Sequence, residues 1–346
     1  MSITVAIGMS GGIDSLVAGF LLKRQYKKVF GIHFTTGYET ENIDFSFIEN
    51  QLDIQIVHID LHSVFEKTIV DYFIQTYLKG KTPNPCLICN KTIKFGSLIA
   101  AAETHGATLF ATGHYARIQR DKTGQIALLK GKDPLKEQSY FLSMLGFEQL
   151  EKAVFPLENM TKKEVHEFAE THHLCQPVKK ESQDICFIKD SPVADFISLK
   201  TNRLFRPGDI VTKENKVIGR HNGLHRFTIG QRRGINCPGP YPYYVLKIDT
   251  KNNKLVVGSR QDLLQKAFYI QDINYLTPHP EFPSRVTAKT RVTAKIRYAH
   301  KGAPAFFIND EKGGKIIFDT PQPAVTPGQA AVLYSGDQVV CAGIIQ

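Results

Sequence analysis

The pattern of apolar and polar positions at the start of the chain predicts a strand, a turn of small residues and a helix. Residues 3–7 form a short apolar run, Ser10, Gly11 and Gly12 follow, and from Asp14 onward apolar side chains recur at helical spacing. The turn therefore stands at the entrance to a helix. Free backbone N–H groups and the helix dipole attract phosphate at such a place, so the first 25 residues predict an anion site.

Later apolar runs in the first half of the chain predict a parallel sheet covered by helices. The runs that we interpret as further strands are residues 29–34, 54–59 and 108–112. Residues 65–78 and 93–104 have a helical apolar pattern between them. Ligands of such sheets bind at the carboxyl ends of the strands, which places residues 10–15, Phe34 and the segment after Phe110 on one rim.

The pattern changes after about Phe205, where helical periodicity gives way to short β-rich runs. These runs are residues 209–212, 243–248, 254–257, 286–294, 305–308, 314–318 and 330–334. Gly, Pro, Asn and Asp separate them. Repeated short strands separated by such turn-forming residues predict small β-domains or a barrel.

Composition and charge narrow the classes of function. The 346 residues carry 43 Lys and Arg against 33 Asp and Glu, a formal net charge of +10, which favours a polyanionic partner. In residues 219–234, basic side chains interleave with Phe227 and glycines, a pattern that fits nucleic-acid contact and a solvated charged face equally well. We find neither an apolar run long enough to span a membrane nor a signal peptide, and expect a cytoplasmic protein without a membrane partner.

Two of the six cysteines, Cys86 and Cys89, fall in a segment that we predict to be a loop, because prolines stand on both sides of Asn84. Flanking lysines, among them Lys91 and Lys94, would raise the thiolate fraction there. We expect no disulfide framework in a chain of this kind. The cysteines that we predict to be small buried hydrophobes are Cys175, Cys237 and Cys341.

The motifs resemble known families. The segment SGGIDS from Ser10 is similar to the SGGxDS loop of the ATP-pyrophosphatase superfamily, whose members cleave ATP between its α and β phosphates. Seven segments in order resemble the tRNA 2-thiouridylase family over nearly the whole chain. They are SGGIDS at Ser10, TPNPCLICNKTIKFG at Thr82, ATGHYAR at Ala111, KEQSYFL at Lys136, ESQDICFI at Glu181, FTIGQRRG at Phe227 and IRYAH at Ile296.

This resemblance implies the fold and the activity. The fold would be α/β, with an ATP-pyrophosphatase domain over 1–203, a small central β-rich tRNA-binding domain over 204–267 and a C-terminal β-barrel over 268–346. The activity would be ATP-dependent replacement of oxygen by sulfur at C2 of the tRNA wobble uridine, U34. ATP and Mg²⁺ would be needed, and a sulfur donor protein would load the enzyme.

The same resemblance implies a role for each matching residue. Cys89 would be the nucleophile, Cys186 the persulfide carrier, and Asp14 would hold the metal. The ATP site would comprise Gly8, Met9, Ser10, Gly11, Gly12, Ile13, Asp14, Ser15, Phe34 and Gly113. The target base would meet Asn84, Pro85 and Cys86. Contacts to the rest of the tRNA would come from His114, Lys136, Glu137, Gln138, Arg297, Tyr298 and Gln329.

Two departures from the family pattern keep alternatives open. The chain is shorter between Phe34 and Leu52, with Phe34 where the family often has Met, which would change adenine packing. Cys86 stands where other members carry Asp. In a second hypothesis, Cys86, Cys89 and Cys186 hold a [4Fe–4S] cluster that serves the same reaction. In a third hypothesis, the chain is a non-catalytic tRNA-binding protein. The persulfide route requires structural freedom around residues 181–188.

Overall fold

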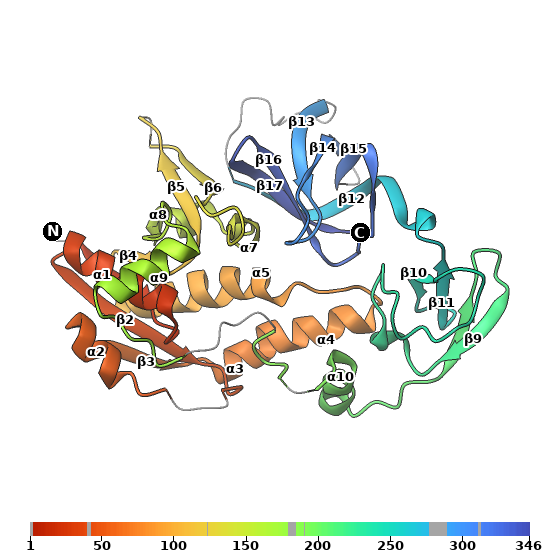
Figure 1. Ribbon diagram of the computed structural model, residues 1–346, viewed down its shortest axis with the longest axis horizontal. Helices are drawn as coiled ribbons and strands as arrows, with labels where there is room; N and C mark the ends of the chain where they lie inside the picture. Colours follow the sequence, from red (N-terminus) through yellow and green to blue (C-terminus); the bar gives the residue numbers. More distant parts are fainter. Residues whose placement is uncertain are drawn as a thin grey trace.

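A computed structural model of the chain describes residues 3–39, 43–122, 124–178, 185–189, 191–276, 289–310 and 313–346. Within these residues the strands form a five-stranded, a four-stranded and an eight-stranded sheet. Figure 1 shows the N-terminal sheet, the small central sheet and the C-terminal strands arranged around two long helical rods. None of the helices described here is long and apolar enough to cross a membrane.

The five-stranded sheet is parallel and confirms the α/β prediction. Its strand order is β3-β2-β1-β4-β7, and all its pairings are parallel. The bounds are β1 (Thr4–Gly8), β2 (Lys28–Thr35), β3 (Ile56–Asp60), β4 (Leu109–Ala111) and β7 (Ala153–Val154). Alternate residues of β1 enter different cores: Val5 and Ile7 pack on one face, and Ala6 packs on the other.

Helices cover both faces of this sheet. On the Val5 and Ile7 face lie α1 (Ile13–Gln25), α2 (Ser46–Leu52) and α9 (Lys162–Thr171). The opposite face is covered by two helical rods. The first consists of α3 (His62–Phe65), the π-helical turn η1 (Glu66–Val70) and α4 (Asp71–Leu78). The second consists of α5 (Pro85–Cys89), the π-helical turns of η2 (Asn90–Ser97) and α6 (Leu98–Thr104).

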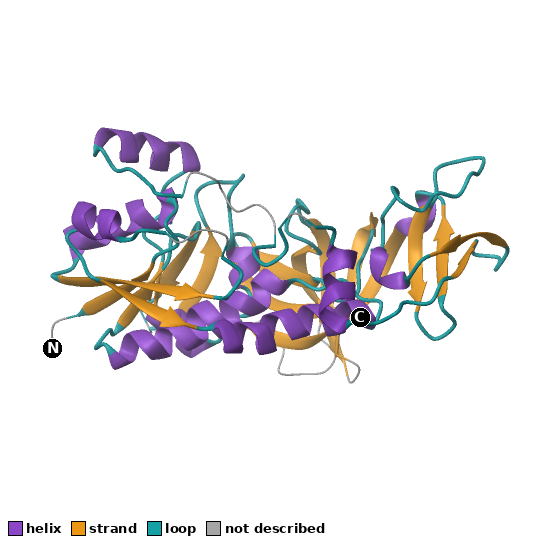
Figure 2. Ribbon diagram, turned by 90° about the horizontal axis from the view of Figure 1, so that it is seen from below, coloured by secondary structure: helices purple, strands orange, loops and turns teal. Residues whose placement is uncertain are grey.

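Short helices and a small sheet complete the central part of the chain. The remaining α-helices are α7 (Ser139–Leu142), α8 (Phe147–Lys152) and α10 (Val193–Thr201). The small sheet has the order β10-β11-β8-β9, with β8 (Gly208–Val211), β9 (Val217–His221), β10 (Tyr244–Asp249) and β11 (Lys254–Gly258). Figure 2 shows this sheet at the end of the molecule opposite the parallel sheet. Gly80, two residues after the end of α4, packs closely against this sheet. A Cβ added at Gly80 would lie 2.8 Å from the side chain of Thr250, the residue after β10.

The C-terminal strands close into a six-stranded antiparallel barrel, which confirms the predicted barrel. Its order is β12-β15-β14-β13-β16-β17, and β17 also pairs with β12. The bounds are β12 (Leu264–Tyr275), β13 (Lys289–Lys295), β14 (Ala303–Asp310), β15 (Gly313–Pro323), β16 (Ala330–Ser335) and β17 (Gln338–Ile345). The first three residues of the predicted strand at 286–294 lie outside the described residues.

A hairpin from the N-terminal half extends the barrel sheet, which the sequence patterns did not predict. Strands β5 (Ala116–Arg120) and β6 (Ile126–Lys130) pair with each other, and Leu129 of β6 pairs with Gln338 of β17. Figure 1 shows the hairpin standing beside the barrel. The N-terminal and C-terminal parts of the chain therefore share one continuous sheet.

Candidate active site

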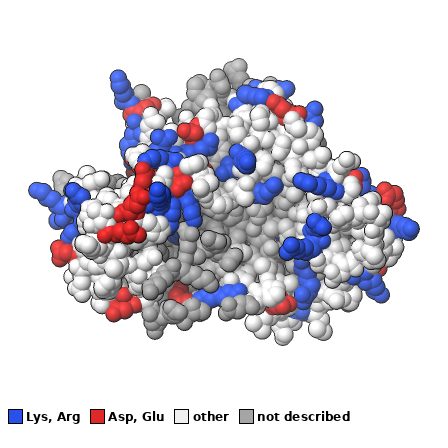
Figure 3. All heavy atoms as spheres, viewed as in Figure 1, with Lys and Arg blue, Asp and Glu red and all other residues white. Residues whose placement is uncertain are grey.

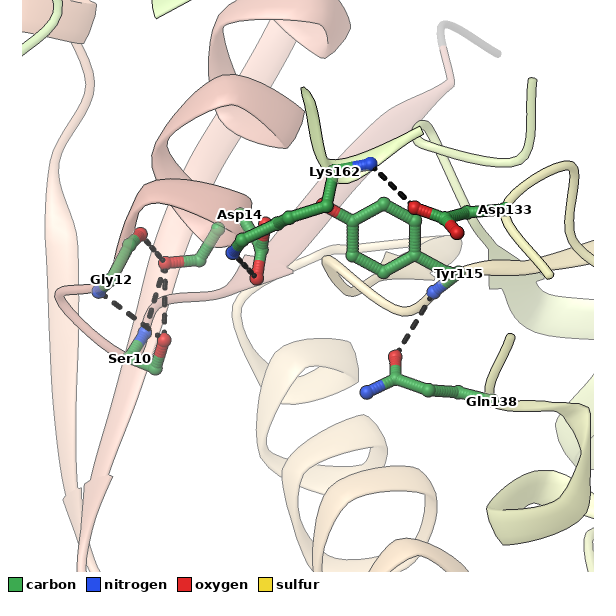
Figure 4. Close-up of polar contacts among 8 residues, drawn as sticks. Ser10, Gly12, Asp14, Tyr115, Asp133, Gln138 and Lys162 are labelled. Atoms are coloured by element: carbon green, nitrogen blue, oxygen red, sulfur yellow. Dashed lines mark hydrogen bonds and ion pairs between the residues drawn. The ribbon is translucent and has the colours of Figure 1, made fainter. Parts of the chain in front are cut away.

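The loop between β1 and α1 lies at the carboxyl edge of the parallel sheet, as predicted. Gly11 has a φ of 80°, in the left-handed region that favours glycine, and Gly12 is the N-cap of α1. The Ser15 hydroxyl donates to the Gly12 carbonyl at 2.9 Å, and the Ser10 N–H donates to the Ser15 hydroxyl at 3.3 Å. Figure 4 shows these contacts closing the loop. The first turn of α1 has N–H groups without intrahelical acceptors, so this edge can bind an anion.

The other residues expected at the nucleotide lie around this loop. Met9 and Ile13 are buried on either side of it, and the Met9 N–H donates to the Ile32 carbonyl at 2.9 Å. Phe34 follows two positions later on β2 and is half-buried. Gly113 lies against the first turn of α1, because a Cβ there would be 2.8 Å from the Asp14 carbonyl carbon. Only glycine fits so close to the backbone at that position.

Asp14 is the centre of a polar network at this edge. Its carboxylate accepts a hydrogen bond from the Tyr115 hydroxyl at 2.6 Å. The Lys162 ammonium lies 2.8 Å from each of the two carboxylate oxygens. The Tyr115 N–H in turn donates to the Gln138 side-chain oxygen at 3.1 Å (Figure 4). The carboxylate is thus neutralised by Lys162 and oriented by Tyr115, whose backbone Gln138 holds in turn.

Sequence reasoning missed Lys162, although one local signal was available. A capping box of Thr161 and Glu164 predicts that a helix begins here, which makes Lys162 its first residue. The helix follows β7, whose carboxyl end lies on the same rim as the loop. The backbone N–H of Lys162 donates to the buried Asp133 carboxylate at 2.7 Å, which fixes the helix end beside Asp14.

The structure overturns the predicted loop around Cys86 and Cys89, because both cysteines lie on α5. Pro85 occupies the first helical turn, where its missing N–H costs nothing. The Asn84 side chain accepts a hydrogen bond from the Leu87 N–H at 3.2 Å and caps the helix. Pro85 thus starts a helix after the Asn84 cap, and the thiols stand on an element that continues into η2.

The thiols of Cys86, Cys89 and Cys186 interact electrostatically with one another and with the Lys94 ammonium. Burial raises the pKa of Cys89 to about 12, against the smaller, opposite effect of Lys94. Cys86 and Cys186 are exposed residues, yet desolvation by surrounding protein also raises the pKa of their thiols. Lys94 therefore acts in the predicted direction, but burial outweighs it and the thiols are not activated by their lysine neighbours.

The segment that carries Cys186 packs beside α5 and the first helical rod. Phe187 is buried in the same core as Leu87, and its ring lies 5.2 Å from the ring of Phe73. Residues 181–184, part of the segment expected to rearrange, lie outside the described residues. Of the three cysteines expected to be buried, Cys341 is buried and Cys237 half-buried, whereas Cys175 is exposed, so that prediction is wrong for Cys175.

Several residues expected at the tRNA form contacts within the protein. The Gln329 side-chain N–H groups donate to the carbonyl oxygens of Thr82 and Pro83, directly before α5, at 3.1 and 2.9 Å. Arg297 donates to the Pro323 carbonyl at 3.3 Å. The Tyr298 ring lies 4.5 Å from that of Phe141. The contacts of Gln329 and Tyr298 tie the barrel to the N-terminal part around the cysteine helix, whereas the contact of Arg297 lies within the C-terminal part.

The remaining expected tRNA residues lie between the nucleotide edge and the barrel. Burial holds the pKa of His114 well below its usual range, and its Nδ1 lies 2.7 Å from the Thr112 hydroxyl. The buried Glu137 carboxylate lies 3.7 Å from the Lys295 ammonium of β13. The Lys136 N–H donates to Asp133 at 3.3 Å, in the loop that also supports Lys162.

Basic side chains are spread over the face shown in Figure 3, from the parallel sheet to the small sheet, whereas the largest acidic group lies at one side. Arg232 and Arg233, in the basic stretch 219–234, are exposed on the small central part. No group of three or more His, Cys, Asp or Glu side chains within the described ranges is arranged to hold a metal ion.

Comparison with known proteins identifies the family. The models of the tRNA methyl transferase HUP domain, the tRNA methyl transferase PRC-barrel domain and the aminomethyltransferase beta-barrel domain match residues 3–190, 195–259 and 265–345. The chain is 46% identical over 345 residues to tRNA-specific 2-thiouridylase MnmA of Desulfosudis oleivorans, with 99% of this chain and 94% of the relative covered. It belongs to the tRNA-specific 2-thiouridylase family.

A second relative supports the same assignment. The tRNA-specific 2-thiouridylase MnmA of Desulfotalea psychrophila is 42% identical over 343 residues, and 98% of each chain is covered. The chain thus spans nearly the full length of these 2-thiouridylases. The parallel sheet, the small sheet and the six-stranded barrel follow one another in the order of the three matched domains.

Proposed function

We propose that the protein catalyses ATP-dependent 2-thiolation of the wobble uridine U34 in tRNA, giving 2-thiouridine. The observation that carries this proposal is the gathering of Cys89 and Cys186, 97 positions apart (186 minus 89), with Lys94. A pair of thiols in a chain that also has a nucleotide loop suits a reaction in which ATP activates oxygen and sulfur replaces it. The division at 1–203, 204–267 and 268–346 remains our proposal for the catalytic, central and barrel domains.

Activation of the base uses ATP as a substrate at the β1–α1 loop. The C2 oxygen of uridine attacks the α-phosphate, pyrophosphate leaves, and the oxygen becomes part of an AMP leaving group. The loop residues 10–15 and the N-terminus of α1 hold and neutralise the phosphates. Mg²⁺, when bound, would neutralise further phosphate charge, and Asp14 is the carboxylate that would hold it.

Sulfur transfer uses the two thiols in sequence. A sulfur donor protein first places a second sulfur on Cys186 as a persulfide. Either Cys89 attacks the inner sulfur of Cys186 and releases hydrosulfide, which adds to C2, or the persulfide adds to C2 and Cys89 then resolves the adduct. AMP leaves in both cases, and both end in a Cys89–Cys186 disulfide that a reductant must reopen.

The target base must leave the base stack of the anticodon loop to reach these groups. A base inside an anticodon loop cannot meet the thiols, so U34 is flipped out toward Asn84, Pro85 and Cys86 at the start of α5. Cys86 is exposed there, one helical turn before Cys89. The exposed Arg232 and Arg233 on the central part hold the tRNA backbone.

The experiment that tests the function is mass spectrometry of U34 in tRNA incubated with the protein, ATP and a sulfur source. We expect a 2-thiouridine product and pyrophosphate release that depends on tRNA. Cys89→Ser and Cys186→Ser each abolish the product, and only Cys186→Ser blocks persulfide loading. Cys86→Ser keeps measurable activity and serves as the matched control on the same helix.

The alternatives predict different results in the same experiment. Loss of activity in Cys86→Ser together with loss of iron from anaerobically purified protein would favour a cluster held by Cys86, Cys89 and Cys186. tRNA binding without tRNA-dependent pyrophosphate release would favour a non-catalytic binding protein. Non-reducing peptide mapping after a single turnover completes the test, because the persulfide route alone leaves Cys89 joined to Cys186.

A further inference from the structure

Glu137 and Lys295 form a buried ion pair between the N-terminal part of the chain and the barrel. The Glu137 carboxylate lies 3.7 Å from the Lys295 ammonium of β13, and the two side chains are only 7% and 13% exposed. The ammonium also lies 5.9 Å from the centre of the Tyr140 ring and 5.6 Å from that of Tyr298. Little of Lys295 can therefore meet RNA phosphate. Buried ion pairs add little net stability, so this pair is better explained by what it holds in place.

The pair belongs to a set of contacts that hold one short segment against the barrel. Glu137 also accepts a hydrogen bond from the Ser139 N–H. The Ser139 hydroxyl lies 3.1 Å from the Tyr334 hydroxyl on β16, and the Tyr140 hydroxyl donates to a carbonyl oxygen of the same strand at 3.0 Å. These side chains are all buried. The barrel therefore determines where residues 137–140 lie.

Gln138, within this segment, holds the nucleotide edge. Its N–H donates to the Tyr115 carbonyl at 2.9 Å, and its side-chain oxygen accepts from the Tyr115 N–H at 3.1 Å. The Tyr115 hydroxyl donates to the Asp14 carboxylate at 2.6 Å (Figure 4). A continuous path of polar contacts and backbone thus joins Lys295 in the barrel to Asp14 in the loop between β1 and α1.

We propose that Lys295 is a positioning residue of the nucleotide site, which through Glu137 sets the place of Gln138 and so holds Tyr115 against Asp14. The inference rests on the proposed function and extends it to a barrel residue. Arg297, expected at the tRNA, follows two positions later in the chain. The part of the barrel expected to meet the tRNA therefore also sets the geometry in which ATP reacts.

The first test is hydrogen exchange of the protein without substrates. Lys295→Met should raise exchange of the Tyr115 and Gln138 amides, because the segment that pairs with them loses its anchor. Lys289→Met is the matched control, since Lys289 is an exposed lysine of the same strand, and it should leave exchange unchanged. Unchanged exchange in Lys295→Met would contradict the proposal. An equal rise in the small central sheet would mean that Lys295 supports the whole fold, and would contradict it too.

The second test is tRNA-dependent pyrophosphate release at saturating ATP and tRNA. Lys295→Met should lower kcat about tenfold to a hundredfold, as expected for a small misplacement of reacting groups, and leave tRNA affinity unchanged. Lys295→Arg keeps the charge and should recover part of the rate, and Lys289→Met should match the wild type. Weaker tRNA binding with an unchanged kcat would show that Lys295 contacts RNA, and would overturn the proposal.

A double-mutant cycle with Tyr115→Phe tests the path itself. Tyr115→Phe removes the hydroxyl that reaches Asp14. If Lys295 acts through Tyr115, Lys295→Met should lower kcat little further once Tyr115→Phe is present, whereas independent sites give additive losses. A full additive loss would contradict the proposed path.

The outcomes also separate this inference from the proposed function. Absence of tRNA-dependent pyrophosphate release by the wild type would contradict the proposed function, and hydrogen exchange would still decide whether Lys295 positions Tyr115. Normal release by the wild type and an equal kcat in Lys295→Met would leave the proposed function intact and remove only Lys295 from it.

Discussion

The side-chain amide of Gln329 in the barrel donates to the carbonyl oxygen of Thr82 at 3.1 Å, across 247 positions of sequence. The barrel holds the same segment by its backbone, because the Thr82 N–H donates to the Pro327 carbonyl at 2.8 Å. Pro85 begins the cysteine helix three residues later. The barrel therefore fixes the start of the helix on which Cys86 and Cys89 stand.

Gln329→Ala should lower the free energy of unfolding by about 1–3 kcal/mol, because it leaves the carbonyl oxygens of Thr82 and Pro83 without these partners. It should slow thiolation while ATP affinity stays unchanged, since the nucleotide loop makes no contact with Gln329. Denaturant unfolding and single-turnover thiolation measure the two effects. The exposed Gln265 of β12 provides a control, Gln265→Ala, that should change neither. Equal thiolation rates in the two variants would contradict the anchoring role.

Asp14→Ala should abolish adenylation and leave tRNA affinity nearly intact. The change removes both the carboxylate that would hold the metal and the ion pair between Asp14 and the Lys162 ammonium. Release of pyrophosphate dependent on tRNA measures adenylation, and filter binding measures tRNA affinity. Unchanged thiolation by this variant would remove the nucleotide role from the loop.

The raised pKa of the Cys89 thiol, about 12, gives thiolation an alkaline pH dependence. Far below that pKa the thiolate fraction rises about tenfold per pH unit, so the single-turnover rate should increase steadily from pH 6.5 to pH 9. A plateau near pH 7 would show that another group sets the rate.

Lys94→Met should slow thiolation at a fixed pH. The Lys94 ammonium lowers the pKa of Cys89, so its removal raises that pKa further and reduces the thiolate. Lys91→Met is the control, because Lys91 is exposed on the same helical rod. Single-turnover rates of the two variants at pH 8 measure the difference, and equal rates would contradict the electrostatic role of Lys94.

Binding of tRNA should weaken with salt, with a log–log slope of about −0.7 for each phosphate neutralised on single strands. Arg232→Ala and Arg233→Ala should each make the slope shallower by about that amount, because both side chains are exposed on the central part. Arg24→Ala, an exposed arginine at the end of α1, should leave it unchanged. A flat dependence for the wild type would argue for a small-molecule substrate.

Local patterns determined much of the architecture. The apolar run, small turn and helical pattern at the N-terminus became β1, the glycine loop and α1, since period and turn chemistry act over a few residues. The β-rich pattern after Phe205 likewise became the small sheet and the barrel. The prediction failed at the cysteine segment, because it gave Pro85 the role of a helix breaker and not that of a first helical residue after an Asn84 cap.

The sequence by itself thus determined most strands and helices of the parallel sheet and the barrel, which loop can receive phosphate, and, through ordered motifs, the family. Only the tertiary structure decided which side chains meet: Lys162 with Asp14 across 148 positions, and Gln329 with Thr82 across 247. It also decided that β12 and β17 close the barrel and that the β5–β6 hairpin joins it. The physical reason is that a local pattern encodes which face of an element is buried, whereas the partner on that face depends on packing between segments far apart in the chain.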